Sequence, residues 1–141
     1  MDGVLDQNIE VKRNWIWAGE QSDIGRLIID HHALIHPSLY EGLPNVVCEA
    51  MAYGRPALVS DVCDNGILIE DNERGYLFDP NDPYSIAEAI NKISQADKSV
   101  WQKLSNNSRN YAVEHLSVQT FTDAYIKLIK LNLQAQGKQF E

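Results

Sequence analysis

The stretch that decides the fold is ALIHPSLYEGLPNVVCEAM, residues 33–51. Its first residues, ALIH, form a short apolar run that ends at Pro37, as a buried strand does. From Pro44 onward apolar residues return at helical spacing, and Gly54 follows as a helix stop. The stretch therefore predicts a buried strand, a loop and a helix in close succession.

The same alternation of strand and helix continues on both sides of this stretch. The segments expected to form buried strands are 14–19 (NWIWAG, with Trp15 and Trp17 in the core), 33–38, 55–60 and 75–78. Helices are expected after a Ser22 or Asp23 cap, from Pro44, from Pro83 behind an Asp82 cap, over 99–114 and from Ser117. Residues 61–74 are expected to be loop. Short apolar strands that alternate with helices predict an α/β fold, a Rossmann-like parallel sheet with helices on both faces.

Length and composition narrow the class of protein. The 141 residues fit a single domain, residues 1–141, with flexible ends expected at 1–12 and 132–141. A net charge of -8 argues against nucleic acid or an anionic membrane as the main partner. Cys48 and Cys63 form no CxxC pair and predict reduced thiols, and no apolar run is long enough to span a membrane. We therefore expect a cytoplasmic protein without a metal site.

In open parallel sheets, ligands bind at the carboxyl ends of the strands, against helix N-termini. The loop before Pro44 lies at such a place. Gly42 would let the backbone approach a ligand closely, and Pro44 suits the first helical position. The backbone amides of residues 45–47 would then point out of the helix start and form an anion site.

Two glutamates flank this loop and helix. Glu49 lies about 7.5 Å further along the helix than Pro44, where its carboxylate could accept hydrogen bonds from a vicinal diol such as a ribose. Glu41, on the loop, would face a group attached to the distal phosphate, such as a sugar hydroxyl. The spacing alone favours the simpler interpretation, two solvated surface charges.

Residues 36–62, HPSLYEGLPNVVCEAMAYGRPALVSDV, closely resemble the signature of the family-4 (group 1) glycosyltransferases, which have the two-domain GT-B fold. The E-x7-E motif corresponds to Glu41 and Glu49, and an A-M-x-x-G-x-P stretch follows at residues 50–56. Similar motifs extend in register upstream, in WAGEQSDIGRLIIDHH, and downstream, in IEDNERGYLFDPNDP. The resemblance therefore covers most of the chain.

The resemblance implies a retaining enzyme that moves a sugar from a UDP- or GDP-sugar to a glycan or lipid-linked acceptor, without a cofactor or metal. Glu41 would be the catalytic residue beside the donor sugar, and Glu49 would bind the ribose. The other donor-binding residues implied are Gly42, Leu43, Pro44, Asn45 and Val46 at the sugar and distal phosphate, and Gly19 and Glu20 near the base.

The family pattern begins well before Met1, so the chain resembles only the C-terminal part of a donor-binding domain. We expect it to be inactive alone, and a full-length protein could work at the inner face of a membrane. In the family's 3-2-1-4-5-6 strand order, the missing strands would leave NWIW (14–17) without neighbours and a sheet edge exposed. We expect either that NWIW adds to the sheet in another position or that two copies of the chain pair or swap through the edge to form a homodimer. The alternatives are a stand-alone nucleotide- or sugar-phosphate-binding module without catalysis and, less favoured, a receiver-type regulatory module.

Overall fold

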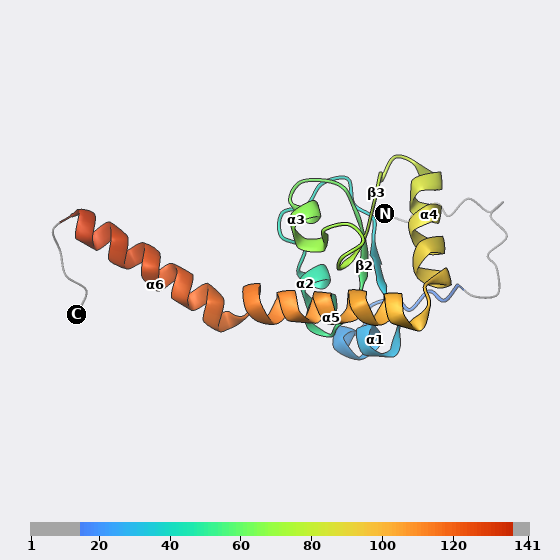
Figure 1. Cartoon of the computed structure of the whole chain (residues 1–141), viewed down its shortest axis with the longest axis horizontal. Coiled ribbons are helices and arrows are strands. Elements are labelled where there is room, and N and C mark those ends of the chain that lie inside the picture. Colours follow the sequence, from blue (N-terminus) through green and yellow to red (C-terminus); the bar gives the residue numbers. More distant parts are fainter. Residues whose placement is uncertain (1–14, 137–141) are drawn as a thin grey trace.

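The computed structural model describes residues 15–136. Within that span, β1 (Leu34–His36), β2 (Ala57–Ser60) and β3 (Gly75–Phe78) form a parallel sheet in the order β1-β2-β3 (Figure 1). Leu34 lies opposite Ala57, which in turn lies opposite Gly75. The strands expected within residues 33–38, 55–60 and 75–78 are therefore confirmed, and consecutive strands are neighbours in the sheet.

Helices follow or precede each strand, as the sequence predicts. They are α1 (Ile24–Asp30), α2 (Asn45–Ala52), α3 (Asn65–Ile69), α4 (Pro83–Gln95), α5 (Lys98–His115) and α6 (Val118–Ala135). The expected caps are present: the side chains of Asp23, Asp82 and Ser117 accept hydrogen bonds from backbone amides in the first turns of α1, α4 and α6. Gly54 has a φ of 66° and ends α2 as expected.

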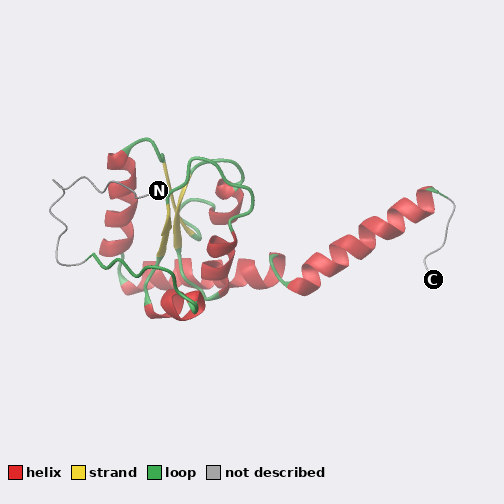
Figure 2. Ribbon diagram, turned by 180° about the vertical axis from the view of Figure 1, so that it is seen from behind, coloured by secondary structure: helices red, strands yellow, loops and turns green. Residues whose placement is uncertain are grey.

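The sheet is covered on both faces, which confirms the Rossmann-like α/β class. Ala57 and Val59 of β2 face one hydrophobic cluster, and Leu58 between them faces the other. The first cluster takes side chains from α2 and α3 and the second from α4, while α5 contributes Ala112 to the first and Leu104 to the second. Figure 2 shows these helices on either side of the strands, with α5 running across one end of the sheet.

The prediction of a strand at 14–19 is wrong for residues 15–19, the part of this range that the structure describes. Residues 15–18 form no strand, and the side chains of Trp15, Ile16 and Trp17 are 67%, 86% and 80% exposed. The expectation that Trp15 and Trp17 belong to the core is therefore also wrong; Asn14 lies outside the described residues. β1 is less buried than expected, because it forms one edge of the sheet and Ile35 is 41% exposed.

Two further differences concern segments expected to be irregular. Residues 61–74 contain the short helix α3, whose Asn65, Leu68 and Ile69 are buried, so a purely loop interpretation is wrong. At the other end, α6 continues to Ala135, while the remainder of the expected C-terminal tail and the expected end at 1–12 lie outside the described residues, apart from Gln136. α6 leaves the body as a projecting arm (Figures 1 and 2), and it has no buried residue.

Candidate functional site

The loop between β1 and α2, residues 37–44, lies at the carboxyl end of the sheet's edge strand and carries most of the candidate residues. Its Glu41 side chain is in contact with His36, the last residue of β1, with 2.8 Å between Glu41 Oε1 and His36 Nε2. Both side chains are about a quarter exposed, at 25% and 26%. Glu41 therefore has a fixed partner on one carboxylate oxygen and reaches solvent as well.

The start of α2 differs in one detail from the expected geometry. Pro44 is the N-cap rather than the first helical residue, and its carbonyl accepts hydrogen bonds from the amides of Val47 and Cys48, at 3.0 and 3.2 Å. The prediction that the Val47 amide points out of the helix start without a partner is therefore wrong. Asn45 and Val46 keep backbone amides without a hydrogen-bond partner in residues 15–136, so two donors remain at the positive end of the helix.

Glu49 has its side chain on the same face of α2 as the side chains of Asn45 and Val46, the residues that carry these two amides, since it follows them by four and three residues. Its side chain is exposed, whereas the opposite side of the helix, with Val47, Ala50 and Met51, is completely buried. The helix therefore presents a carboxylate one turn beyond its open amides. The sequence predicted a carboxylate beside three open amides, and two of those three, at Asn45 and Val46, are open.

Gly42 and Leu43 are both exposed on the loop, and Leu43 is 63% exposed. A Cβ atom added to Gly42 would meet nothing within 4 Å. No contact inside the described chain therefore requires a glycine at this position. A ligand that approaches the backbone would be a physical reason for one.

Gly19 and Glu20 are exposed and form no hydrogen bond or ion pair with residues 41–49 in the part of the chain that the structure describes. The helix that follows them, α1, packs along α2: the Gly25 backbone lies close to the Tyr53 hydroxyl, and Ile24 lines a cavity together with Val46. Glu41, residues 42–46 and Glu49 thus lie on one loop and the helix that follows it, while Gly19 and Glu20 belong to a separate segment that precedes α1.

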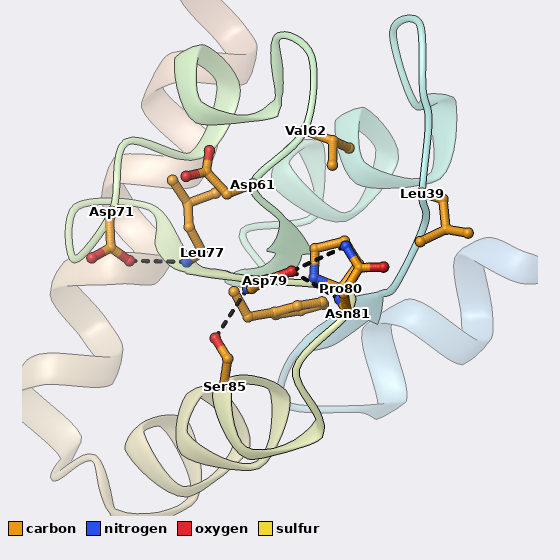
Figure 3. Close-up of a pocket in the computed structure, with 10 residues that line it drawn as sticks. Leu39, Asp61, Val62, Asp71, Leu77, Asp79, Pro80, Asn81 and Ser85 are labelled. Carbon is orange, nitrogen blue, oxygen red and sulfur yellow. Dashed lines mark hydrogen bonds between the residues drawn. The ribbon is translucent and has the colours of Figure 1, made fainter.

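A cavity of about 630 Å³ lies at the carboxyl ends of β2 and β3, beside the same loop (Figure 3). Leu39 of the loop, Asp61 after β2, and Asp79 after β3 all line it. Among the polar residues that follow β2, Asp61 lines this cavity, while Asp64 and Asn65 do not. The cavity thus adjoins the loop but contains none of residues 41–49.

Sequence reasoning missed the polar residues that β3 and the turns around it bring to this cavity. Asp71 accepts a hydrogen bond from the Leu77 amide at 2.9 Å, and Asp79 accepts one from the Asn81 amide at 2.8 Å (Figure 3). The Asp79 amide donates to Ser85 Oγ at 3.0 Å. The sequence feature that could have identified Asp79 and Asn81 is the polar run DPNDP (79–83), which directly follows a strand. Because carboxylates repel a phosphate, the start of α2 suits an anion better than this cavity does.

Comparison with known proteins connects this geometry to a family. Residues 4–115 match the family model described as "Glycosyl transferases group 1". A galactosyltransferase of Escherichia coli, named for transfer from UDP-Gal to α-D-GlcNAc-diphosphoundecaprenol, is 28% identical over 86% of this chain. Glycosyltransferase 1 domain-containing protein 1 of Xenopus tropicalis is 30% identical over 83% of the chain. The chain spans about a third of the length of these relatives, 32% and 33%.

Solved structures agree with this similarity. Sucrose-phosphate synthase from Thermosynechococcus elongatus superposes with a TM-score of 0.67 at 28% identity, over 74% of this chain and 26% of the synthase chain. TarM superposes equally well, with a TM-score of 0.67 over 78% of this chain and 22% of its own, but at 21% identity it supports the fold alone. The family match covers α1 to α5 and includes the whole candidate site. The chain therefore belongs to the group 1 glycosyltransferase family.

Proposed function

We propose that this chain forms part of the donor site of a retaining glycosyltransferase that takes a sugar from a nucleoside diphosphate sugar. In this proposal the amides of Asn45 and Val46 hold the distal phosphate, Glu49 accepts hydrogen bonds from the ribose hydroxyls, and Glu41 lies beside the donor sugar. Gly42, Leu43 and Pro44 form the backbone wall of the site. Gly19 and Glu20 contribute near the base.

The observation that carries the proposal is the pair of open amides at the start of α2, with Glu49 one turn along the same side of the helix. Aligned amides and the helix dipole favour a phosphate, and a carboxylate one turn away favours a diol. A nucleoside diphosphate contains both groups, separated by a short linkage.

The names of the relatives suggest the class of donor and acceptor. The Escherichia coli relative is named for a UDP-sugar donor and a lipid-linked acceptor, and a Rhizobium meliloti relative for lipopolysaccharide core biosynthesis. We accordingly propose a UDP- or GDP-sugar donor and a glycan or lipid-linked acceptor. We also propose a cytoplasmic site of action, transfer without a metal ion, and a homodimer formed through the outer edge of β1.

The chain alone should bind the donor weakly. Two amides and one carboxylate provide roughly three charge-assisted hydrogen bonds, at about 1.5–3 kcal/mol each. Association costs at least about 4 kcal/mol. The difference corresponds to millimolar or weaker binding. Among residues 15–136, no Arg or Lys side chain is hydrogen-bonded to or ion-paired with residues 41–49, so we expect this chain to bind without transferring the sugar.

Ligand-observed NMR with UDP, GDP and ADP, each with and without an attached sugar, tests the proposal at these affinities. Glu49→Ala should abolish binding of all these nucleotides, whereas Glu88→Ala, an exposed glutamate on α4, should change nothing. Gly42→Ala should keep the fold, because its Cβ meets no atom within 4 Å, yet weaken binding of the sugar nucleotides. Nucleotide binding that persists unchanged in Glu49→Ala would contradict the proposed site.

A further inference from the structure

Two hydrogen bonds hold the loop that carries the candidate donor residues to the last residues of β1 and β2. His36, the last residue of β1, contacts Glu41 across 2.8 Å. The Ser38 amide donates a 2.8 Å hydrogen bond to Ser60 Oγ, and Ser60 is the last residue of β2. Both fastening side chains therefore belong to the rigid sheet rather than to the loop.

Ser60, whose side chain holds the base of the loop, lies in the protein interior. Ser60 is 0% exposed, its hydroxyl accepts the Ser38 amide, and its carbonyl accepts Asn65 Nδ2 at 2.9 Å. The base of the loop is thus held by one partly buried hydrogen bond to a buried side chain, whose own carbonyl is held by Asn65; such a bond stabilises more than an exposed one does. Only the outer part of the loop, from Leu39 to Leu43, depends on another contact for its position.

The contact between His36 and Glu41 fixes the tip of the loop. A carboxylate only accepts hydrogen bonds, so His36 must carry its hydrogen on Nε2 to donate to Glu41 Oε1. Neutral imidazole in that tautomer and the imidazolium ion both provide this donor. One oxygen of Glu41 is then occupied, and rotation of the carboxylate is restricted.

We propose that His36 is a positioning residue that holds Glu41 through Oε1, so that the other carboxylate oxygen is presented to the donor sugar. The inference rests on the proposed function, because it assigns the sugar to Glu41. His36 belongs to neither hydrophobic cluster of the sheet, so its side chain contributes little to the core. Its effect is on the geometry of the loop and on the part of binding that the sugar supplies.

The test compares His36→Gln with His36→Leu. Glutamine can donate from a nitrogen close to the position of the imidazole Nε2, whereas leucine fills similar volume without a donor. His115→Leu is the matched control, since His115 is exposed at the end of α5 and distant in sequence from the loop. Two quantities are measured: amide hydrogen exchange of residues 39–43, and the affinity gained when a nucleoside diphosphate carries its sugar.

His36→Leu should speed exchange of the loop amides and reduce the affinity gained from the sugar, each by about tenfold, since loss of one charge-assisted hydrogen bond costs about 1.5 kcal/mol or more. Affinity for the nucleoside diphosphate alone should stay unchanged. His36→Gln should retain most of both properties. In the Glu41→Ala background, His36→Leu should add nothing, because the histidine acts through the glutamate.

Three results decide against the inference. His36→Leu could leave both quantities unchanged, His36→Gln could behave like His36→Leu, or the two substitutions could add independently in the double variant. Any of these overturns the positioning role while donor binding by the parent still stands. If the parent binds neither ligand, the proposed donor site is wrong, and the assignment of a sugar-positioning role to His36 fails with it; the exchange data then show only whether His36 orders the loop.

Discussion

At the scale of single residues, the two cysteines differ in their surroundings although both are free thiols. Cys48 is half-buried on α2 and packs against the cluster that contains Val47 and Met51. Burial raises the pKa of the Cys48 thiol, a backbone hydrogen bond partly opposes this, and the charge of Glu49 adds to the increase. Cys63 is exposed in the turn after β2, with a φ of 50°.

This difference predicts the order of alkylation. A raised pKa leaves less of the reactive thiolate at any given pH, so Cys48 should react slowly with iodoacetamide until the pH exceeds the ordinary thiol range. Cys63 should react first at pH 8. Peptide mass spectrometry after timed alkylation between pH 7 and 10 measures both rates. Equal rates at pH 8 would show that the burial of Cys48 has no chemical effect.

Gly75 provides a second prediction at this scale. A Cβ atom at Gly75 would lie 1.8 Å from the carbonyl oxygen of Ala57, its partner in β2. Gly75→Ala must therefore separate β2 from β3, and it should cost about 3 kcal/mol or more of the free energy of unfolding. Urea unfolding followed by circular dichroism measures this. Gly42→Ala is the control, since its Cβ has open space, and it should unfold at the parent's urea concentration.

At the scale of elements, α5 connects the two faces of the sheet and starts from a strong cap. The Asp97 carboxylate accepts hydrogen bonds from the Ser99 hydroxyl at 2.6 Å and from the amides of Ser99 and Val100 at 2.8 and 2.9 Å. The Ser99 hydroxyl, followed by these amides, holds the pKa of Asp97 below its ordinary value. The cap therefore favours the ionised form in the folded protein.

The sign of this shift predicts a pH dependence for one variant. Because the pKa of Asp97 is lowered by folding, its contribution to stability is complete above the ordinary carboxyl pKa of 3.8 and is lost as the pH falls through the lowered value. Asp97→Ala should be less stable than the parent at pH 7, and the difference should shrink below pH 3.8. Urea unfolding at several pH values measures it. Asp123→Ala, on exposed α6, should show no such convergence.

The helices that the sequence predicts best are those whose starts are encoded locally. The side chains of Asp82 and Ser117 form hydrogen bonds only within their own first turns, and Pro83 follows Asp82 directly, so the sequence alone identifies α4 and α6. α3 was missed because its stability depends on remote contacts. Asn65 is completely buried and donates to the Ser60 carbonyl, and Leu68 and Ile69 pack under the sheet. The sequence of a five-residue helix contains no local pattern that predicts such contacts.

At the scale of the whole molecule, α6 stands apart from the rest of the fold. It contributes no buried residue, and the family match ends at residue 115, before the helix begins. A chain that ends at Ser117 should therefore unfold at the same urea concentration as the parent. A longer deletion that also removes Ala112 and Leu116 takes side chains from the hydrophobic cluster beneath the sheet and should lower stability. Circular dichroism of the two truncated chains distinguishes these outcomes.

The last prediction concerns the proposed homodimer, which would form through the outer edge of β1. Among residues 15–136 no strand pairs with that edge, and Ile35 is 41% exposed there. Such an edge favours pairing with another chain, and a charged side chain opposes it. If the proposed homodimer uses this edge, Ile35→Lys should shift the protein to monomer in sedimentation velocity. Ile67→Lys, an exposed position on α3, should not; a parent that is monomeric at all concentrations would refute the dimer.

The sequence by itself determined the parallel α/β class, the strand–loop–helix junction at residues 33–51, and the family, because apolar periodicity, caps and motif spacing are local properties of the chain. Tertiary structure alone decided which groups meet. It placed His36 in contact with Glu41, paired the Val47 amide with the Pro44 carbonyl in a hydrogen bond, and left Trp15 and Trp17 exposed. A strand needs neighbours to supply hydrogen bonds and burial, so the apolar composition of residues 15–17 is not enough to make them a strand.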